Sequence, residues 1–151
     1  MLRTQLSDAL KEAMKARNER GVSTVRMILS TLKDRDIAAR SKGNHDGIPE
    51  DEIRSMLQGM IKQRRESIAL YEQGGRPELV KQEQEEIAVI EGFLPKQLGD
   101  AEIEQAAKAV IAETGATSIK DMGKAMAVMK QRYAGQMDMT KASAAVKKLL
   151  G

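Results

Sequence analysis

The side chains best suited to chemistry in this sequence are bases gathered in its last quarter. Residues 116–151 carry seven bases and two acids, whereas residues 1–95 carry 16 of each. The seven bases are Lys120, Lys124, Lys130, Arg132, Lys141, Lys147 and Lys148. A fixed row of cations gains affinity for nucleic acid by releasing condensed counterions. The pattern therefore indicates a phosphate-tracking surface, with a merely solubilising face as the alternative.

Aromatic content decides which nucleic acid such a surface suits. The chain holds one Phe, two Tyr and no Trp. Proteins that bind single strands stack successive bases on aromatic rings. A folded RNA, recognised by its shape and its backbone, fits this composition better.

Catalytic and metal-binding patterns are missing from the sequence. Cysteine is absent, and the single histidine, His45, stands beside Asp46 in a polar stretch, which is a poor set of metal ligands. Gly123-Lys124 does not belong to a phosphate-binding P-loop, because Ser118 occupies the position of the required first glycine. We therefore assign no catalytic residue, no metal and no cofactor, and lean against an enzyme.

Three further groups of residues stand out in the sequence. Five of the ten methionines lie between 122 and 139, and Met137 and Met139 fall outside the helical stripe of the others. Flexible thioethers suit adaptable interfaces, so these two residues support an alternative function as a protein-interaction module. A smaller basic cluster comprises Lys62, Arg64 and Arg65. The acidic run Glu83, Glu85, Glu86 and Glu91 is typical of a solvated helix face.

Apolar residues recur at helical spacing almost throughout, and no segment alternates with period two. The pattern predicts an all-α protein with four helices in its N-terminal part, arranged as an antiparallel bundle. The first helix is expected to stop at Gly21, and Ser23 to cap the second, with Val22 and Met27 as a hydrophobic staple. Pro77 is expected to open the fourth.

A hinge is predicted in the stretch EGFLPKQLGD, residues 91–100. Pro95 disfavours helix at the preceding residue, and Phe93 is expected to be an apolar plug. Gly99 and Asp100 are both suitable N-caps for the following helix, and with Gly99 as the cap, Glu102 falls at the capping-box position. Three smaller helices complete the chain. The predicted domains are residues 1–94, a helical hairpin bundle, and residues 95–151, a three-helix domain.

Composition and the first residues of the sequence indicate where in the cell the protein is expected. The absence of cysteine suits a reducing compartment, and no apolar run approaches the ~18 residues of a membrane span. The start, MLRTQLSDALKEAMKAR, mixes acids with bases along an amphipathic pattern, unlike a signal peptide. We expect a cytoplasmic protein with no membrane partner.

FLPKQL, DMGKAM and GQMD, together with IKQRRESIALYEQGGRPELVKQEQEEIAVIEGFLP, resemble the YqeY family of small bacterial proteins. The second half is also similar to the tail domain of the GatB subunit of aspartyl/glutamyl-tRNA amidotransferase. The resemblance covers essentially the full length. It implies an all-α fold with four helices followed by three.

The resemblance also implies a function, because the amidotransferase tail engages the body of tRNA. Lys120, Lys124, Lys130 and Arg132 become expected backbone contacts, and Lys141 and Lys147 extend this set. Gly123 would permit close helix packing or RNA approach, and Gly135 and Asp138 would shape the turn before the last helix.

The expected role is thus a non-catalytic tRNA-binding or tRNA-metabolism accessory, with amidotransferase or aminoacyl-tRNA synthetase components as further partners. The family label, carbon–nitrogen ligase with glutamine as amido-N-donor, describes relatives of the tail. The chain shows neither their kinase half nor an amidase-like arrangement of serine and lysine.

Overall fold

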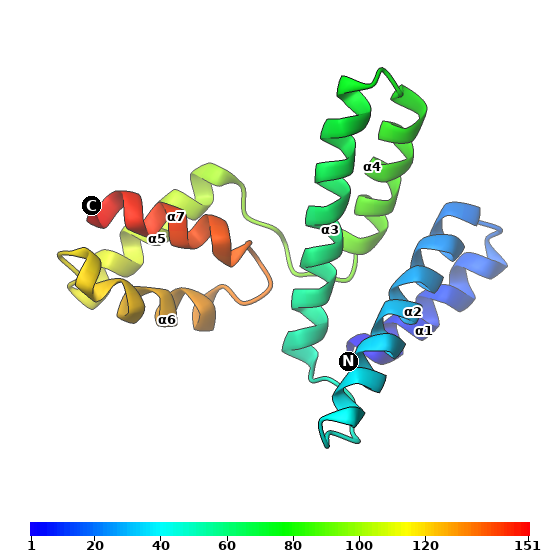
Figure 1. The fold of residues 1–151 in the computed structure, drawn as a ribbon, viewed down its shortest axis with the longest axis horizontal. Coiled ribbons are helices and arrows are strands. Elements are labelled where there is room, and N and C mark those ends of the chain that lie inside the picture. The colour runs from blue at the N-terminus through cyan, green and yellow to red at the C-terminus, as the bar shows by residue number, and fades with distance from the viewer. The chain divides into compact units, whose positions relative to one another are not determined.

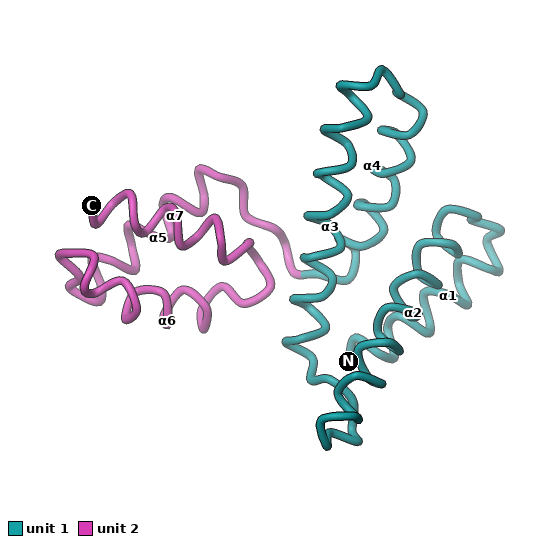
Figure 2. Tube along the Cα trace, in the orientation of Figure 1, with its two compact units in different colours: residues 1–94 teal, residues 95–151 magenta.

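A computed structural model describes all 151 residues and confirms the all-α fold, with no strand. Contacts divide the chain into two compact units, unit 1 (residues 1–94) and unit 2 (residues 95–151; Figures 1 and 2). Unit 1 contains α1 (Leu2–Lys15), α2 (Glu19–Ser41), α3 (Glu50–Gln73) and α4 (Pro77–Glu91). Unit 2 contains α5 (Asp100–Thr114), the short 3-10 helix η1 (Ile119–Asp121), α6 (Met122–Arg132) and α7 (Met139–Leu150).

Unit 1 is built from two helical hairpins, α1 with α2 and α3 with α4 (Figure 1). All four helices contribute to one apolar core, in which Leu6, Ile28, Leu57 and Ile90 are fully buried. Pro77 opens α4 as expected, since its fixed φ and missing N–H suit the first helical position. No helix in either unit has the length and apolar character needed to cross a membrane.

The turn between α1 and α2 differs from the sequence prediction. Asn18 caps α2 by accepting a hydrogen bond from the Gly21 backbone N–H at 3.0 Å, so Ser23 lies one turn inside the helix. Gly21 does not end α1; it is buried within α2, where an added Cβ would lie 2.8 Å from Nδ2 of the capping Asn18 and 3.3 Å from Cβ of Ala13. The prediction missed that the Asn18 cap and the approach of α1 leave no room for a side chain here.

The segment before Pro95 belongs to unit 1. Phe93 and Leu94 are half-buried and pack against the core of that unit. Backbone hydrogen bonds from both residues to the last turn of α4 continue its winding briefly before the chain leaves it. The only phenylalanine therefore seals one end of the unit 1 core.

Unit 2 has its own core, centred on Ala107, Val110, Met129 and Val146. Gly99 caps α5, and the Glu102 carboxylate accepts a hydrogen bond from its backbone N–H at 3.4 Å. Of the two N-caps that the sequence allows, the structure has Gly99, and Asp100 is the first residue of the helix.

Two motifs distant in the sequence meet in unit 2. Gln97 donates a hydrogen bond from Nε2 to the Gly135 carbonyl at 2.6 Å, and the Leu98 N–H donates to the Gln136 carbonyl at 2.8 Å. Gly135 has a φ of 76°, which glycine adopts without strain. Asp138 then caps α7 by accepting from the Thr140 N–H at 2.8 Å. The FLPKQL segment and the GQMD turn therefore hold one another in place.

Candidate functional site

The acids of unit 2 are all engaged within that unit. Asp100, Glu104 and Glu113 form ion pairs with bases, and Glu102, Asp121 and Asp138 accept hydrogen bonds from backbone N–H groups. The hydrogen bonds leave the charges of Glu102, Asp121 and Asp138 in place, but none of these three carboxylates forms an ion pair with a base.

Six of the nine bases of unit 2 have no acidic partner. They are Lys96, Lys120, Lys124, Lys130, Lys147 and Lys148, and all six are exposed. The only ion-paired bases of the unit are Lys108, Arg132 and Lys141. An excess of unpaired, solvated cations is what a polyanion requires of a binding surface.

Arg132 differs from the lysines because it makes a two-pronged ion pair. Its Nη1 and Nη2 atoms donate to the Glu113 carboxylate at 2.7 and 2.8 Å, which joins the ends of α6 and α5. These hydrogen bonds raise the pKa of Arg132 and lower the pKa of Glu113. Lys141 lies 3.5 Å from Asp100. Both bases are therefore partly neutralised, which weakens their assignment as primary RNA contacts.

The predicted bases fall at two ends of unit 2 rather than in one row. Lys130 and Arg132 end α6, and Lys141 begins α7. Lys120 lies in η1 and Lys124 in the first turn of α6, and the last turn of α7 comes to this same end. A Cβ added to Gly151 would lie 3.8 Å from Cδ1 of Ile119.

We call Lys120, Lys124, Lys147 and Lys148 the lysine end. Lys148 was counted among the seven bases but left out of the predicted site. Lys148 follows Lys141 by seven residues, which is two helical turns and places both on one face of the last helix. This spacing is the sequence signal that would have added Lys148 to the predicted site.

Gly123 lies at the lysine end with open space around it. No heavy atom outside its immediate neighbours comes within 4 Å of the position that a Cβ would occupy. Close packing within unit 2 therefore does not explain this glycine. Of the two roles implied by the resemblance, the approach of an external group is the one that remains compatible with the geometry.

The methionines proposed as an interface are instead part of the core. Met137 is only 1% exposed, and Met139 is half-buried against the same cluster. The hypothesis of a protein interface is wrong for Met137, because the turn before α7 folds inward; for the half-buried Met139 it stays a prediction. A stripe analysis of the helices alone does not reveal which loop residues fill a core.

A buried ion pair in unit 1 was also missed. Arg64 and Glu86 are 7% and 6% exposed, and Arg64 Nε donates to the Glu86 carboxylate at 3.0 Å. Arg20 of α2 lies 3.9 Å from the same carboxylate and pairs with Glu85 at 3.2 Å. The predicted solvated acidic face is therefore wrong for Glu86 and also for Glu83, whose side chain is 16% exposed and lies 4.0 Å from Arg64 Nε.

The three bases of the predicted cluster Lys62, Arg64 and Arg65 also lie in different environments. Arg64 is a buried structural residue, Arg65 pairs with Glu91 at 3.4 Å, and Lys62 alone is a free, exposed base. His45 is exposed in the loop between α2 and α3.

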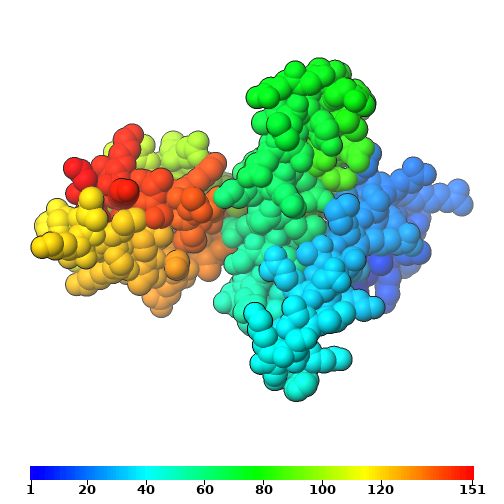
Figure 3. All heavy atoms as spheres, in the orientation of Figure 1, coloured from blue at the N-terminus to red at the C-terminus, as the bar shows by residue number.

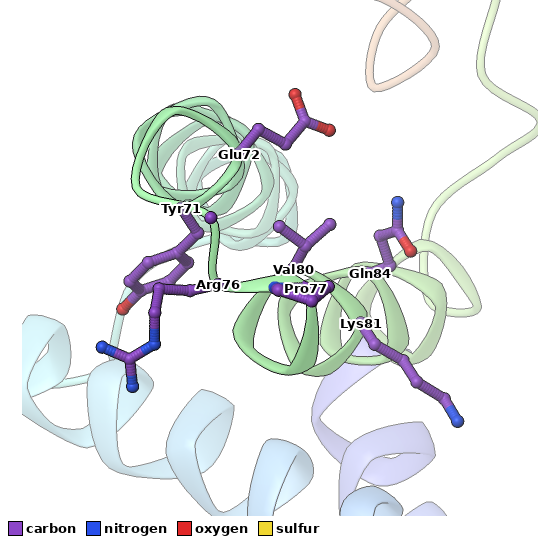
Figure 4. A pocket seen from close by; sticks show the side chains of 8 residues that line it. Tyr71, Glu72, Arg76, Pro77, Val80, Lys81 and Gln84 are labelled. Carbon is purple, nitrogen blue, oxygen red and sulfur yellow. The ribbon is translucent and has the colours of Figure 1, made fainter.

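The α3–α4 turn carries a small hollow of about 300 Å³. Figure 4 shows the Arg76 side chain alongside the Tyr71 ring, with Pro77 and Val80 to their right. Arg76 Nε donates to Glu78 at 2.8 Å, so its charge is compensated. Gly75, with a φ of 66°, allows the sharp reversal that the turn needs. This part of the IALYEQGGRPELV motif is explained by the hairpin.

These features define the class of the protein. It is an all-α protein of two small helical units, and the second unit carries unpaired lysines. A family model described as "Yqey-like protein" matches residues 3–150, and the chain belongs to the YqeY family.

Curated relatives share the name "Altered inheritance of mitochondria protein 41, mitochondrial". The protein of Eremothecium gossypii is 33% identical over 91 residues, which cover 59% of this chain and 46% of the relative. That of Kluyveromyces lactis is 32% identical over 88 residues, covering 58% and 45%. That of Vanderwaltozyma polyspora is 27% identical over 124 residues, covering 78% and 64%. The chain thus spans about half the length of the first two.

These names correct one expectation. A cytoplasmic location is contradicted, because the relatives are named as mitochondrial proteins. Lack of cysteine and lack of a long apolar segment are compatible with more than one compartment, so composition was a poor guide.

Proposed function

We propose that this protein binds tRNA as a non-catalytic accessory of tRNA metabolism, and that unit 2 supplies the contact surface. One observation carries the proposal: all six acids of unit 2 are engaged within it, whereas six of its nine bases have no acidic partner. The resemblance of this half to a domain that engages the tRNA body supports tRNA as the ligand.

The lysine end is the proposed centre of contact. Lysine carries a compact charge on a flexible stem, which suits phosphates whose positions vary along a folded RNA. The open space at Gly123 leaves room for a sugar–phosphate backbone to approach the start of α6. Lys130 extends the surface, and Arg132 and Lys141 contribute once their acidic partners are displaced or shared.

Amide transfer is not part of the proposal. The relatives of the tail act beside subunits that activate a carboxylate and release ammonia, and this chain offers no catalytic group for either step. We place the protein beside amidotransferase or aminoacyl-tRNA synthetase components, as a protein that holds or presents tRNA.

The test compares two triple variants with the same change in charge. In one, Lys120, Lys124 and Lys147 are replaced by alanine; in the other, the unpaired lysines of unit 1, Lys11, Lys33 and Lys81, are replaced. Binding of bulk tRNA is measured over a range of salt concentrations, and helical content is checked by circular dichroism. Each lost phosphate contact lowers the log–log salt slope by roughly 0.7–0.9.

We expect the unit 2 variant to lose about two to three units of slope, and the unit 1 variant to stay close to the original protein. Equal losses of salt slope in both variants would show that the binding is only general charge attraction. An absence of binding even at low salt would overturn the proposal.

A further inference from the structure

A groove in unit 1 has no role in the folding argument or in the proposed function. It lies between α2 and α3, has a volume of about 390 Å³, and is lined by ten residues. Figure 3 shows the surfaces of these two helices adjoining. Met27, Met56 and Met60 contribute thioethers to the lining; Met56 and Met60 are buried, at 2% and 7% exposed, and Met27 alone presents substantial surface, at 43% exposed. An adaptable apolar surface of this kind is typical of sites that receive partner helices.

A glycine in the middle of a helix marks the same groove. Gly59 lies well inside α3, with a negative φ and no heavy atom within 4 Å of its Cβ position outside its own helix neighbourhood. Glycine disfavours a helix interior relative to alanine, and neither a turn nor close packing within unit 1 requires it here. The missing side chain leaves the groove open where a partner backbone would approach.

Two free cations border the groove. Arg35 on α2 and Lys62 on α3 are exposed and have no ion pair. Arg64 forms part of the wall, but its charge is compensated by Glu86 at 3.0 Å and Glu83 at 4.0 Å. Glu66 is the one acid among the lining residues.

We infer that the α2–α3 groove binds an amphipathic helix of a partner protein, with an apolar side chain on Met27 and acidic side chains facing Arg35 and Lys62. Charge complementarity selects the occupant: two free bases against one acid match an acidic helix and disfavour a basic one. This surface is separate from the lysine end, so unit 1 binds a protein while unit 2 binds RNA.

The probes are two helical peptides of equal length, about 18 residues each, with the same leucine stripe and with either glutamates or lysines beside it. Methionine methyl groups labelled with carbon-13 report the site of binding by NMR. Met27, Met56 and Met60 line the groove, and the methionines of unit 2 serve as internal controls. We expect the glutamate peptide to shift the three groove signals and the lysine peptide to leave them unchanged.

Gly59→Gln fills the groove, and Gly123→Gln is its matched control, because both glycines have open Cβ positions. The first variant is expected to weaken the glutamate peptide at least about tenfold, a change of about 1.4 kcal/mol, and the second to leave binding unaltered. Binding that survives Gly59→Gln would overturn the assignment of the groove.

Arg35→Glu combined with Lys62→Glu tests the charge argument. The matched control reverses Arg26 and Lys81, which are exposed and unpaired and lie outside the groove. We expect the first double variant to lose binding of the glutamate peptide and to gain binding of the lysine peptide. The control double variant is expected to bind both peptides as the original protein does. Equal binding of both peptides by the original protein, or groove signals that respond to tRNA and not to the glutamate peptide, would overturn the proposal.

Discussion

Unit 1 and unit 2 are both small helical units, yet their charged residues serve different ends. Unit 1 buries an arginine–glutamate pair between its helices, and Arg3 clamps Asp36 with two hydrogen bonds of 2.7 and 2.9 Å. Unit 2 has an apolar core and keeps its charges outside. Planar guanidinium groups suit fixed geometry and flexible ammonium groups suit solvated contacts, so the contrast separates charges that hold the fold from charges available to a ligand.

The largest expected effect is on the buried pair. Glu86→Ala removes the nearer partner of the buried Arg64 charge and leaves it only Glu83, at 4.0 Å; breaking a buried pair costs up to about 3–5 kcal/mol of unfolding free energy. Glu85→Ala removes a partly exposed partner of Arg20 and is expected to cost less than about 1 kcal/mol. Urea unfolding followed by methionine methyl signals measures each unit separately.

Two outcomes would blur the comparison between the units. Similar losses for Glu86→Ala and Glu85→Ala would show that the interior pair carries no special weight. A loss of the unit 2 signals together with those of unit 1 would show that the two units unfold together. The double change Arg64→Met with Glu86→Leu removes both charges and is expected to be far milder than Glu86→Ala.

The cap of α7 gives the next effect. Asp138→Ala removes the acceptor of the Thr140 N–H and is expected to lower the stability of unit 2 by about 1 kcal/mol. Asp138→Asn keeps an acceptor and should stay near the original value. Thermal unfolding of both variants measures the change in stability. Equal losses of stability in the two variants would show that this hydrogen bond does not stabilise unit 2.

Gly59→Ala should act in the opposite direction. Its Cβ meets open space, so the change removes the helix penalty of glycine and raises the stability of unit 1 by about 0.8 kcal/mol. Denaturant midpoints at constant m-value test this. A destabilised variant would mean that the residue is needed for folding, and the argument for an open groove would fall.

The smallest effect depends on pH. Burial, followed by the nearby Glu86 carboxylate, raises the pKa of Glu83. A carboxyl with a higher pKa in the folded state binds more protons there, so it lowers stability as pH rises from the unfolded toward the folded pKa. Glu83→Gln should therefore gain less than about 1 kcal/mol at neutral pH. That gain should fade below the ordinary glutamate pKa, and a constant gain at every pH would contradict this cause.

Local signals determined much of this fold from the sequence. Helical periodicity, Pro77 at the start of α4 and the Gly99 cap with Glu102 depend on residues at most four positions apart, so they can be identified without a structure. The sequence prediction is wrong for the turn between α1 and α2. It ends the first helix at Gly21, whereas Asn18, a suitable capping residue nearby, already caps α2.

Only the tertiary structure decided the rest, because burial and pairing depend on residues far apart in the chain. Arg64 meets Glu86 across 22 positions, and Arg132 meets Glu113 across 19. Composition supplied the excess of bases near the C-terminus, but packing determined which of them stay free. The position of Met137 in the core has the same origin, since a loop residue is buried by the helices that close over it.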